Sequence, residues 1–405
     1  MSAFDEQQGA VGMATEGVGA RLKAARKLAG VTQVWLESRI GYTLSMIKKV
    51  EQGSKPASAA FVAESARALG INPATLYGTN GREVVAEPSQ DSASIAELRT
   101  ALDLFDDPRP EGRPLTLAAI DRKLSTVAED VLRLRLGAAA RDLPALLHHL
   151  YVLAERPDHK GEQARALLHD AYRLTATVAG RFRQTDLAAI ASERHVQIAE
   201  STGDPLRVSI SKYHRSRRYL QNGDFSAGLR LLERARENVG SNTAGKAVTV
   251  QLDLCAAMLA ARSGDVVQAD GYLEEARSLS TEFRLPEAPY HGVDASMTNI
   301  LAHWCAAPVE NYDGTEAVRR AAEVEIEDPH RPERVGHHHI DMARAWVLHG
   351  DRRHALKQLN MARRVAPNTT RHHPAVRETV LAMANADHRA TDSLAGFAQW
   401  AHIKV

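Results

Sequence analysis

The sequence predicts an all-α protein in which a short basic domain of five helices precedes an α-solenoid, a long array of paired helices. From Ile95 onward, alanine and leucine recur at three- and four-residue spacings, with Pro and Gly as breaks. No stretch shows a convincing strand alternation, and aromatic residues make up only 5% of the chain. A Gly-Asp dipeptide also recurs in register at three positions, which is typical of repeated helix pairs.

Length and composition limit the number of domains and the class of protein. The 405 residues suggest two or three domains, and 44% hydrophobic residues suffice for packed cores. No apolar run approaches the roughly 18 residues of a membrane helix, and no secretory signal is visible, so no membrane partner is expected. The two cysteines, Cys255 and Cys305, make neither a disulfide framework nor a metal motif, and a cytoplasmic location is expected.

The net charge of +1 conceals an uneven distribution. Residues 1–16, which we interpret as a flexible tail, carry a net charge of −3, whereas residues 17–78 carry +6. Residues 79–94 are polar and contain Pro and Gly, as expected of a linker, and residues 95–405 make up the predicted helical domain. A basic module on a nearly neutral body is typical of nucleic-acid binding. A solvated basic face explains the same charge, and charge alone does not decide between the two.

Residues 17–78 show short helical patterns that are broken at glycines. The first helix is expected to bury Leu22 and Leu28. Thr32 and Thr43 are expected to cap the second and third helices, which end near residues 40 and 51. A fourth helix covers residues 58–69, and Leu76 helps to close the core. The third helix is basic on its outer face, so the second and third helices and the glycine turn between them make a helix-turn-helix.

This segment resembles the Cro/C1-type repressor DNA-binding domain over about 60 residues. The resemblance implies binding to double-stranded DNA as a homodimer. Lysine suits guanine acceptors or phosphate, and leucine can meet a thymine methyl group. The residues that carry the resemblance are Leu22, Arg26, Thr32, Gln33, Leu36, Gly41, Ile47, Glu51, Gly53, Pro56 and Leu69. By role, the implied DNA contacts are to the backbone at the groove mouth (Gln33 and Thr43), to bases (Leu44, Ser45 and Lys49, with Lys48 beside them) and to a phosphate (Lys55).

Two residues depart from the family's pattern. Glu37 stands where the family usually has a small residue, so its carboxylate must bend outward or find a cation such as Arg39. Leu44 stands where a polar base-reading residue is common. Glu51 is expected to be structural, joining the third helix to an N–H group or to Arg26. Trp35, on the second helix, either packs on the linker or a partner, or covers its own domain.

The long C-terminal region contains an internal repeat with a spacing of about 43 residues. Around each Gly-Asp turn, small residues stand seven positions before the glycine and five and twelve after it, and a leucine stands nine after it. Glycine supplies a permissive backbone and aspartate caps the second helix of the pair. A degenerate copy is therefore expected around 289–325, and a weaker one around 164–201. The three turns are Gly223-Asp224, Gly264-Asp265 and Gly350-Asp351.

This pattern resembles the tetratricopeptide repeat over roughly residues 160–365, with Pro367 at the position of its closing proline. An ordinary α-helical bundle remains the alternative. The resemblance implies a concave surface that takes a peptide or protein ligand. Tyr213, Arg217, Asn299 and His303 are the candidate ligand residues, although each of them could equally be solvated or bridge neighbouring helices.

The sequence gives little support for catalysis. Walker, GxSxG and HExxH motifs are absent, so we expect neither an enzyme nor a cofactor. Three consecutive residues on a helix point about 100° apart, so His337, His338 and His339 are not expected to bind one metal ion.

Two functions stay open. The first is a sequence-specific transcriptional regulator whose body dimerises and senses a peptide, protein or small molecule. The second is an interaction scaffold with a degenerate helix-turn-helix.

Overall fold

The computed structural model describes most of the 405 residues. Every regular element in the described ranges is a helix, which confirms the predicted all-α class. The predicted tail, residues 1–16, and most of the predicted linker, 79–94, lie outside these ranges. Helix α7 begins at Gln90, so residues 90–94 of that linker are helical. The described ranges are 17–78, 90–112, 115–182, 184–283, 285, 292–329, 331–386 and 392–403.

We call residues 17–78 the head and the described residues from Gln90 onward the body. Both predicted caps are present in the head: Thr32 Oγ1 accepts from the Trp35 N–H at 3.0 Å, and Thr43 Oγ1 accepts from the Met46 N–H at 3.3 Å. The second helix ends at Glu37, earlier than predicted. The head helices are α2 (Val18–Leu28), α3 (Gln33–Glu37), α4 (Leu44–Glu51), α5 (Ala59–Leu69) and α6 (Pro73–Tyr77).

The predicted burial of Leu28 is wrong, because this side chain is 92% exposed. Helix α2 instead buries the face formed by Val18, Gly19, Arg21, Leu22 and Arg26. Leu28 follows Leu22 by six positions, which at about 100° per residue places it two-thirds of a turn away from that face. Four other predicted core residues, Leu22, Leu36, Ile47 and Leu76, are fully buried.

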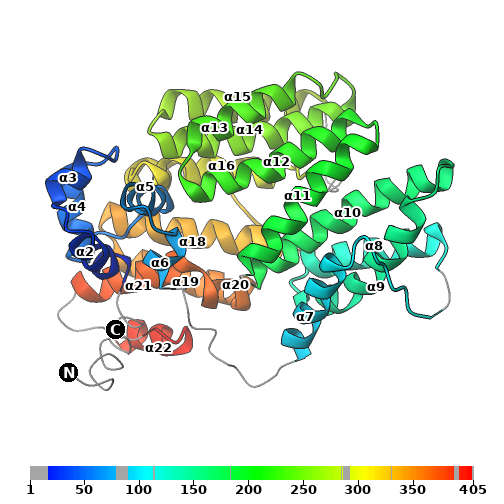
Figure 1. Cartoon of the computed structure of the whole chain (residues 1–405). Coiled ribbons are helices and arrows are strands. Elements are labelled where there is room, and N and C mark those ends of the chain that lie inside the picture. The colour runs from blue at the N-terminus through cyan, green and yellow to red at the C-terminus, as the bar shows by residue number, and fades with distance from the viewer. Residues whose placement is uncertain are drawn as a thin grey trace, which may run out of the picture.

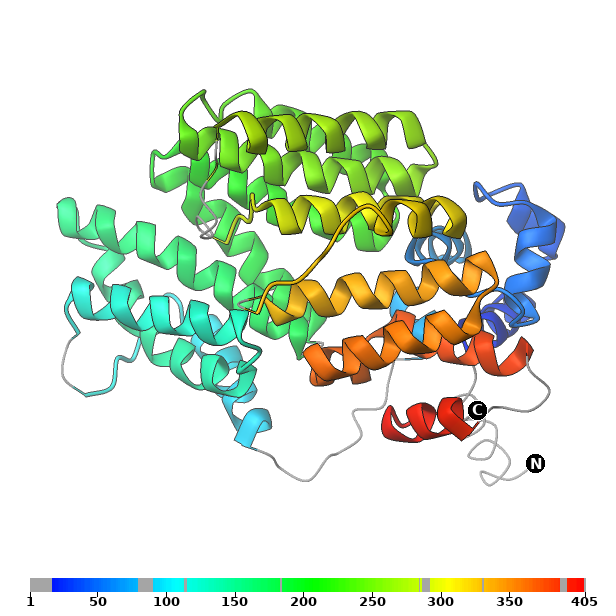
Figure 2. The same ribbon diagram turned by 180° about the vertical axis from the view of Figure 1, so that it is seen from behind.

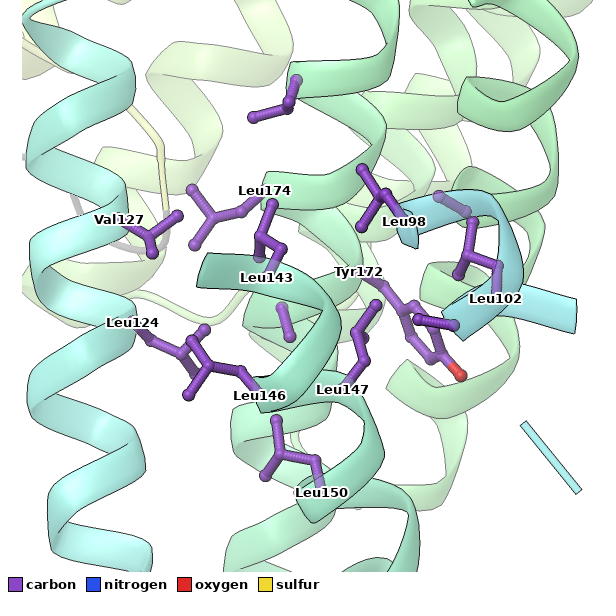
Figure 3. Packing of buried hydrophobic residues seen from close by; sticks show 14 of the residues in the cluster. Leu98, Leu102, Leu124, Val127, Leu143, Leu146, Leu147, Leu150, Tyr172 and Leu174 are labelled. Atoms are coloured by element: carbon purple, nitrogen blue, oxygen red, sulfur yellow. The ribbon is translucent and has the colours of Figure 1, made fainter. Parts of the chain in front are cut away.

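The body begins with a bundle of long helices packed around a leucine-rich core (Figure 3). Leu143, Leu146, Leu147 and Leu150 come from a single helix, α9, and pack against side chains from α7, α8 and α10. This core accounts for the dense leucine pattern that the sequence shows after Ile95. The bundle consists of α7 (Gln90–Asp103), α8 (Leu117–Leu132), α9 (Leu136–Ala154) and α10 (His159–Arg181), with α11 (Thr185–Ser201) packed on α10.

Four antiparallel helix pairs follow, and they include the three predicted Gly-Asp turns. Gly223, Gly264 and Gly350 have φ values of 77°, 87° and 101°. This is the left-handed region, which favours glycine. The aspartate after each glycine accepts from the N–H three residues later, at 2.9–3.3 Å. The pairs are α12 (Pro205–Asn222) with α13 (Phe225–Arg236), α14 (Thr243–Ser263) with α15 (Val266–Phe283), α16 (Met297–Glu310) with α17 (Gly314–Ala321), and α18 (Pro332–His349) with α19 (Arg352–Val365).

The α16–α17 pair is the degenerate copy expected around 289–325. Its turn keeps the aspartate, because Asp313 Oδ1 accepts from the Glu316 N–H at 2.8 Å. The glycine is replaced by Tyr312, which nevertheless has a φ of 60°. The described C-terminal residues form three further helices: α20 (Pro367–His372), which opens on the predicted closing proline, α21 (Pro374–Ala386) and α22 (Asp392–Trp400).

The head packs against the body, with α5 against α12 and further contacts to the C-terminal pairs. Figures 1 and 2 show α2–α6 beside α16, α18 and α21, on the opposite side of the molecule from the α7–α9 bundle. One described helix, α14, is long and apolar enough to span a membrane, but 78% of its apolar window is buried inside the protein. The same test is passed by core helices of soluble proteins, and α14 occupies the middle of the repeat stack.

Candidate nucleic-acid interface

Helix α4 presents most of the predicted DNA-contacting side chains to solvent. Ser45, Lys48 and Lys49 are exposed on its outer side, as is Thr43 at its N-cap, and Leu44 is half-buried at its first position. On the opposite side, Met46, Ile47 and Val50 are buried in the head core. The structure therefore brings five of the seven predicted contacts together at one helix, with the two lysine charges adjacent.

A buried ion pair fixes α4 against α2. The Arg26 guanidinium donates to both carboxylate oxygens of Glu51, at 2.7 and 2.9 Å, which confirms the structural role predicted for Glu51. The hydrogen bond to Glu51 raises the pKa of Arg26, although burial acts in the other direction. Gln33 Nε2 donates to Glu51 Oε2 at 2.7 Å, so the side chain predicted to touch the DNA backbone is engaged within the head.

Glu37 caps α4 instead of disturbing it. Its Oε1 accepts from the Leu44 N–H at 2.7 Å, at the first turn of the helix. A carboxylate there satisfies a free backbone donor and interacts favourably with the positive end of the helix dipole. The predicted outward bend or pairing with Arg39 is therefore wrong. The Arg39 guanidinium lies 5.4 Å from the Trp35 ring centre, and Trp35 packs on the core of its own domain.

Lys55 is separate from the α4 group. Its side chain is half-buried, and its Nζ lies 4.6 Å from the ring centre of Tyr312 in the body. Burial lowers the pKa of Lys55, and the nearby charge of Lys49 acts in the same direction. The lysine predicted to reach a phosphate thus makes a cation–π contact at the head–body junction.

Among the described residues, hydrogen bonds at three places hold the head on the body. The Ser58 N–H donates to the Tyr312 hydroxyl at 2.8 Å. The Val18 N–H, at the start of α2, donates to both oxygens of Glu378, each at 3.1 Å. Asn385 Nδ2 donates to the Gly53 carbonyl at 3.3 Å. Apolar packing adds to these bonds, because Ala60 of α5 is part of the core formed by α12–α14.

The four predicted ligand residues lie on α12 and α16, but their exposure differs. Asn299 is fully buried and donates to the Asp294 carbonyl at 2.6 Å, so it presents no surface to a ligand in this conformation. His303 Nδ1 is 2.8 Å from the Asn299 carbonyl, and burial together with nearby arginine charge lowers the pKa of His303 to about 3. Tyr213 is half-buried and Arg217 is exposed.

Sequence reasoning missed a further cation beside these residues. Arg334 on α18 acts electrostatically on Tyr213 and His303, as Arg217 does. Within the described ranges, the guanidinium groups of Arg217 and Arg334 have neither a hydrogen bond nor an ion pair. Burial lowers the pKa of Arg334, and the charge of Arg217 contributes. The repeat alignment gave no sign of this grouping, because the two arginines come from helix pairs more than 100 residues apart in sequence.

The described ranges hold no group of three His, Cys, Asp or Glu side chains that is placed to bind a metal ion. The histidine run lies within α18, where His338 and His339 are buried and His337 is half-buried. Both cysteines, Cys255 and Cys305, are buried and free.

Comparison with known proteins agrees with this description of the head. Residues 18–76 match the family model described as a helix-turn-helix domain. Among solved structures, the chain is similar to a mutant of PrgX at 12% sequence identity and a TM-score of 0.25, over 86% of this chain and 94% of that one. That TM-score is too low to support a functional argument. No curated protein matches the chain. The chain thus joins a helix-turn-helix domain to an all-helical body.

Proposed function

We propose that this protein is a cytoplasmic, Cro/C1-type transcriptional regulator that binds double-stranded DNA through its head. The observation that carries the proposal is the exposed outer side of α4, held rigidly by Glu51 at one end and Glu37 at the other. Ser45, Lys49 and Leu44 would face bases in the major groove, Lys48 would lie beside them, and Thr43 would contact the DNA backbone. Gln33 would serve first to orient Glu51.

The alternative, a scaffold with a degenerate helix-turn-helix, rested on Glu37 and Leu44. The hydrogen bond from Leu44 N–H to Glu37 removes the first argument, because it makes the carboxylate a supporting group for α4. Leu44 remains compatible with both functions, since leucine can meet a thymine methyl group. The structure therefore favours DNA binding over a scaffold.

Two exposed lysine pairs on the head allow a matched test. In a mobility-shift titration at low salt, Lys48→Ala/Lys49→Ala is expected to weaken duplex binding at least tenfold, on the order of the energy of one good base or phosphate contact. Lys23→Ala/Lys27→Ala removes the same charge from exposed positions of α2 and is expected to have a much smaller effect. Equal losses in both double variants, or no duplex binding by the wild type, contradict the proposal. Genomic footprinting of the tagged protein would then supply the operator.

We further propose that the body dimerises and senses a signal. A dimer would place two α4 helices about 34 Å apart, one helical turn of DNA. Arg217 and Arg334, whose guanidinium groups form no ion pair within the described residues, lie beside Tyr213 and His303 and favour a ligand with an anionic group, such as a peptide carboxylate or an acidic small molecule. Native mass spectrometry of the purified protein tests both ideas, because it reports the oligomeric state and any bound ligand. A monomer in which Arg217→Ala/Arg334→Ala retains the same ligand would contradict them.

A further inference from the structure

The turn between α16 and α17 differs from its three counterparts in one residue. Where the other turns have glycine, this one has Tyr312 with a φ of 60°, while the aspartate that follows keeps its capping role. A bulky side chain is unfavourable in the left-handed region and persists only where its surroundings hold it there. The position of Tyr312 therefore calls for an explanation outside the turn itself.

The side chain of Tyr312 is held in place by residues of the head. The Tyr312 ring packs against the head core and meets the Tyr42 ring edge-on, with centres 6.1 Å apart. Its hydroxyl accepts from the N–H of Ser58, the N-cap of α5, whose residue exposure is only 1%. Burial raises the pKa of Tyr312, so the hydroxyl stays protonated. A glycine in this turn would provide none of these contacts.

The same ring also holds Lys55. The Lys55 Nζ lies 4.6 Å from the ring centre, on a half-buried side chain, whereas Lys48 and Lys49 are exposed. An ammonium group placed on a ring at the junction cannot at the same time extend to a DNA phosphate. The Lys55 side chain can therefore contact Tyr312 while the head is docked, or bind a DNA phosphate, but it cannot do both at once.

We propose that Tyr312 is a latch that docks the head on the body and withholds Lys55 from DNA, so that release of the latch adds one phosphate contact. This inference rests on the proposed DNA-binding function and concerns its regulation. The body would then control the head through a single turn of its repeat, and any rearrangement that moves the α16–α17 turn away from Ser58 would change DNA affinity.

Two substitutions separate the parts of the latch. Tyr312→Gly restores the turn of the other repeats and removes both ring and hydroxyl, whereas Tyr312→Phe removes the hydroxyl alone. Without DNA, amide hydrogen exchange at Ser58 is expected to accelerate in both variants, because both lack its acceptor. Tyr312→Asn, which tolerates a positive φ, replaces the glycine variant if that one fails to fold.

With a mixed-sequence duplex, the slope of log K against log [salt] reports the number of phosphate contacts, at about 0.9 per contact. The slope is expected to be steeper by about 0.9 in Tyr312→Gly than in the wild type. Lys55→Gln is expected to remove this increment in the Tyr312→Gly background and to have a smaller effect in the wild type. Lys48→Gln serves as the control, since it should lower the slope equally in both backgrounds.

Equal slopes for the wild type and Tyr312→Gly, or equal effects of Lys55→Gln in both backgrounds, overturn the proposal. Failure of the wild type to bind any duplex refutes the proposed function and with it the role of Lys55. Ser58 exchange remains a separate readout of the docking: acceleration in the Tyr312 variants supports it, and unchanged exchange refutes it.

Discussion

Replacing Glu37 tests whether its carboxylate supports or disturbs the recognition helix. The 2.7 Å hydrogen bond from the Leu44 N–H is charge-assisted and half-buried, and it lies at the positive end of α4. Substitutions that remove a helix cap cost about 1–2 kcal/mol. Glu37→Ala is therefore expected to destabilise α4 by about that amount, and Glu37→Gln, which keeps an acceptor but loses the charge, by roughly half as much.

Native-state amide hydrogen exchange measures this locally, since about 1–2 kcal/mol corresponds to roughly 5–30-fold faster exchange. The amides of α4 should show that acceleration in Glu37→Ala. Glu64→Ala is the matched control, because Glu64 Oε2 accepts from the Gly41 N–H at 2.8 Å, in the turn before α4 and not at its first turn. A duplex titration should show no gain in affinity for Glu37→Ala, although a negative charge beside the DNA-facing side has been removed. Unchanged α4 exchange together with tighter duplex binding would refute the capping role.

Two buried carboxylates predict opposite responses to pH. Burial raises the pKa of Asp253 to about 8, although the Arg236 side chain lies 3.0 Å away. The protonated form is therefore favoured in the folded protein, and the contribution of Asp253 to stability falls as pH rises from about 4 to 8. Asp253→Asn should raise the melting temperature at pH 8 and change it little at pH 4. For Glu310, the effect of burial on the pKa is outweighed by the charges of Arg262 and Arg344, which hold the pKa at about 2. The ionised Glu310 side chain contributes on the order of 3 kcal/mol to the stability of the fold above pH 4.5, and this contribution is lost as pH falls toward 2. Acid unfolding of Glu310→Gln should therefore lack part of the pH dependence of the wild type, and identical profiles would contradict the assignment.

The sequence was most informative where the controlling interaction is local. Thr32 and Thr43 each accept a hydrogen bond from the backbone N–H three residues later, at the start of the helix that they cap. The Gly-Asp turns that begin at 223, 264 and 350 likewise depend on residues close together in sequence. Such interactions depend on spacing along the chain, so the sequence pattern predicts them directly. The partner of Glu51 was also predictable, because the helix-turn-helix pattern places α2 and α4 side by side.

The contacts that the sequence did not predict are those that join separate segments of the chain. Glu37 bonds to a backbone N–H seven residues away, across the turn between α3 and α4, and its pattern suggested only a misfit with the family. Lys55 makes a cation–π contact with Tyr312, which is more than 250 residues away in sequence. Asn299 has a side chain that could bind a ligand, yet its amide donates a hydrogen bond to the carbonyl of Asp294, in the loop before its own helix. No composition or periodicity encodes these contacts, since each depends on the final packing of the chain.

The anchors of the head also constrain how the body can act on it. Tyr312 belongs to the turn between α16 and α17, whereas Glu378 and Asn385 both belong to α21, on the other side of the α18–α19 pair. A relative shift between α16 and α21 would therefore break the hydrogen bonds of at least one anchor. The head would then keep its hydrogen bonds to one of these two places, the α16–α17 turn or α21, and lose those to the other. Either movement displaces α4, because Arg26 and Glu51 fix that helix within the head. If the proposed dimer binds two half-sites at fixed spacing, a rearrangement in the repeat stack that moves the head would change the position of α4 relative to the second half-site.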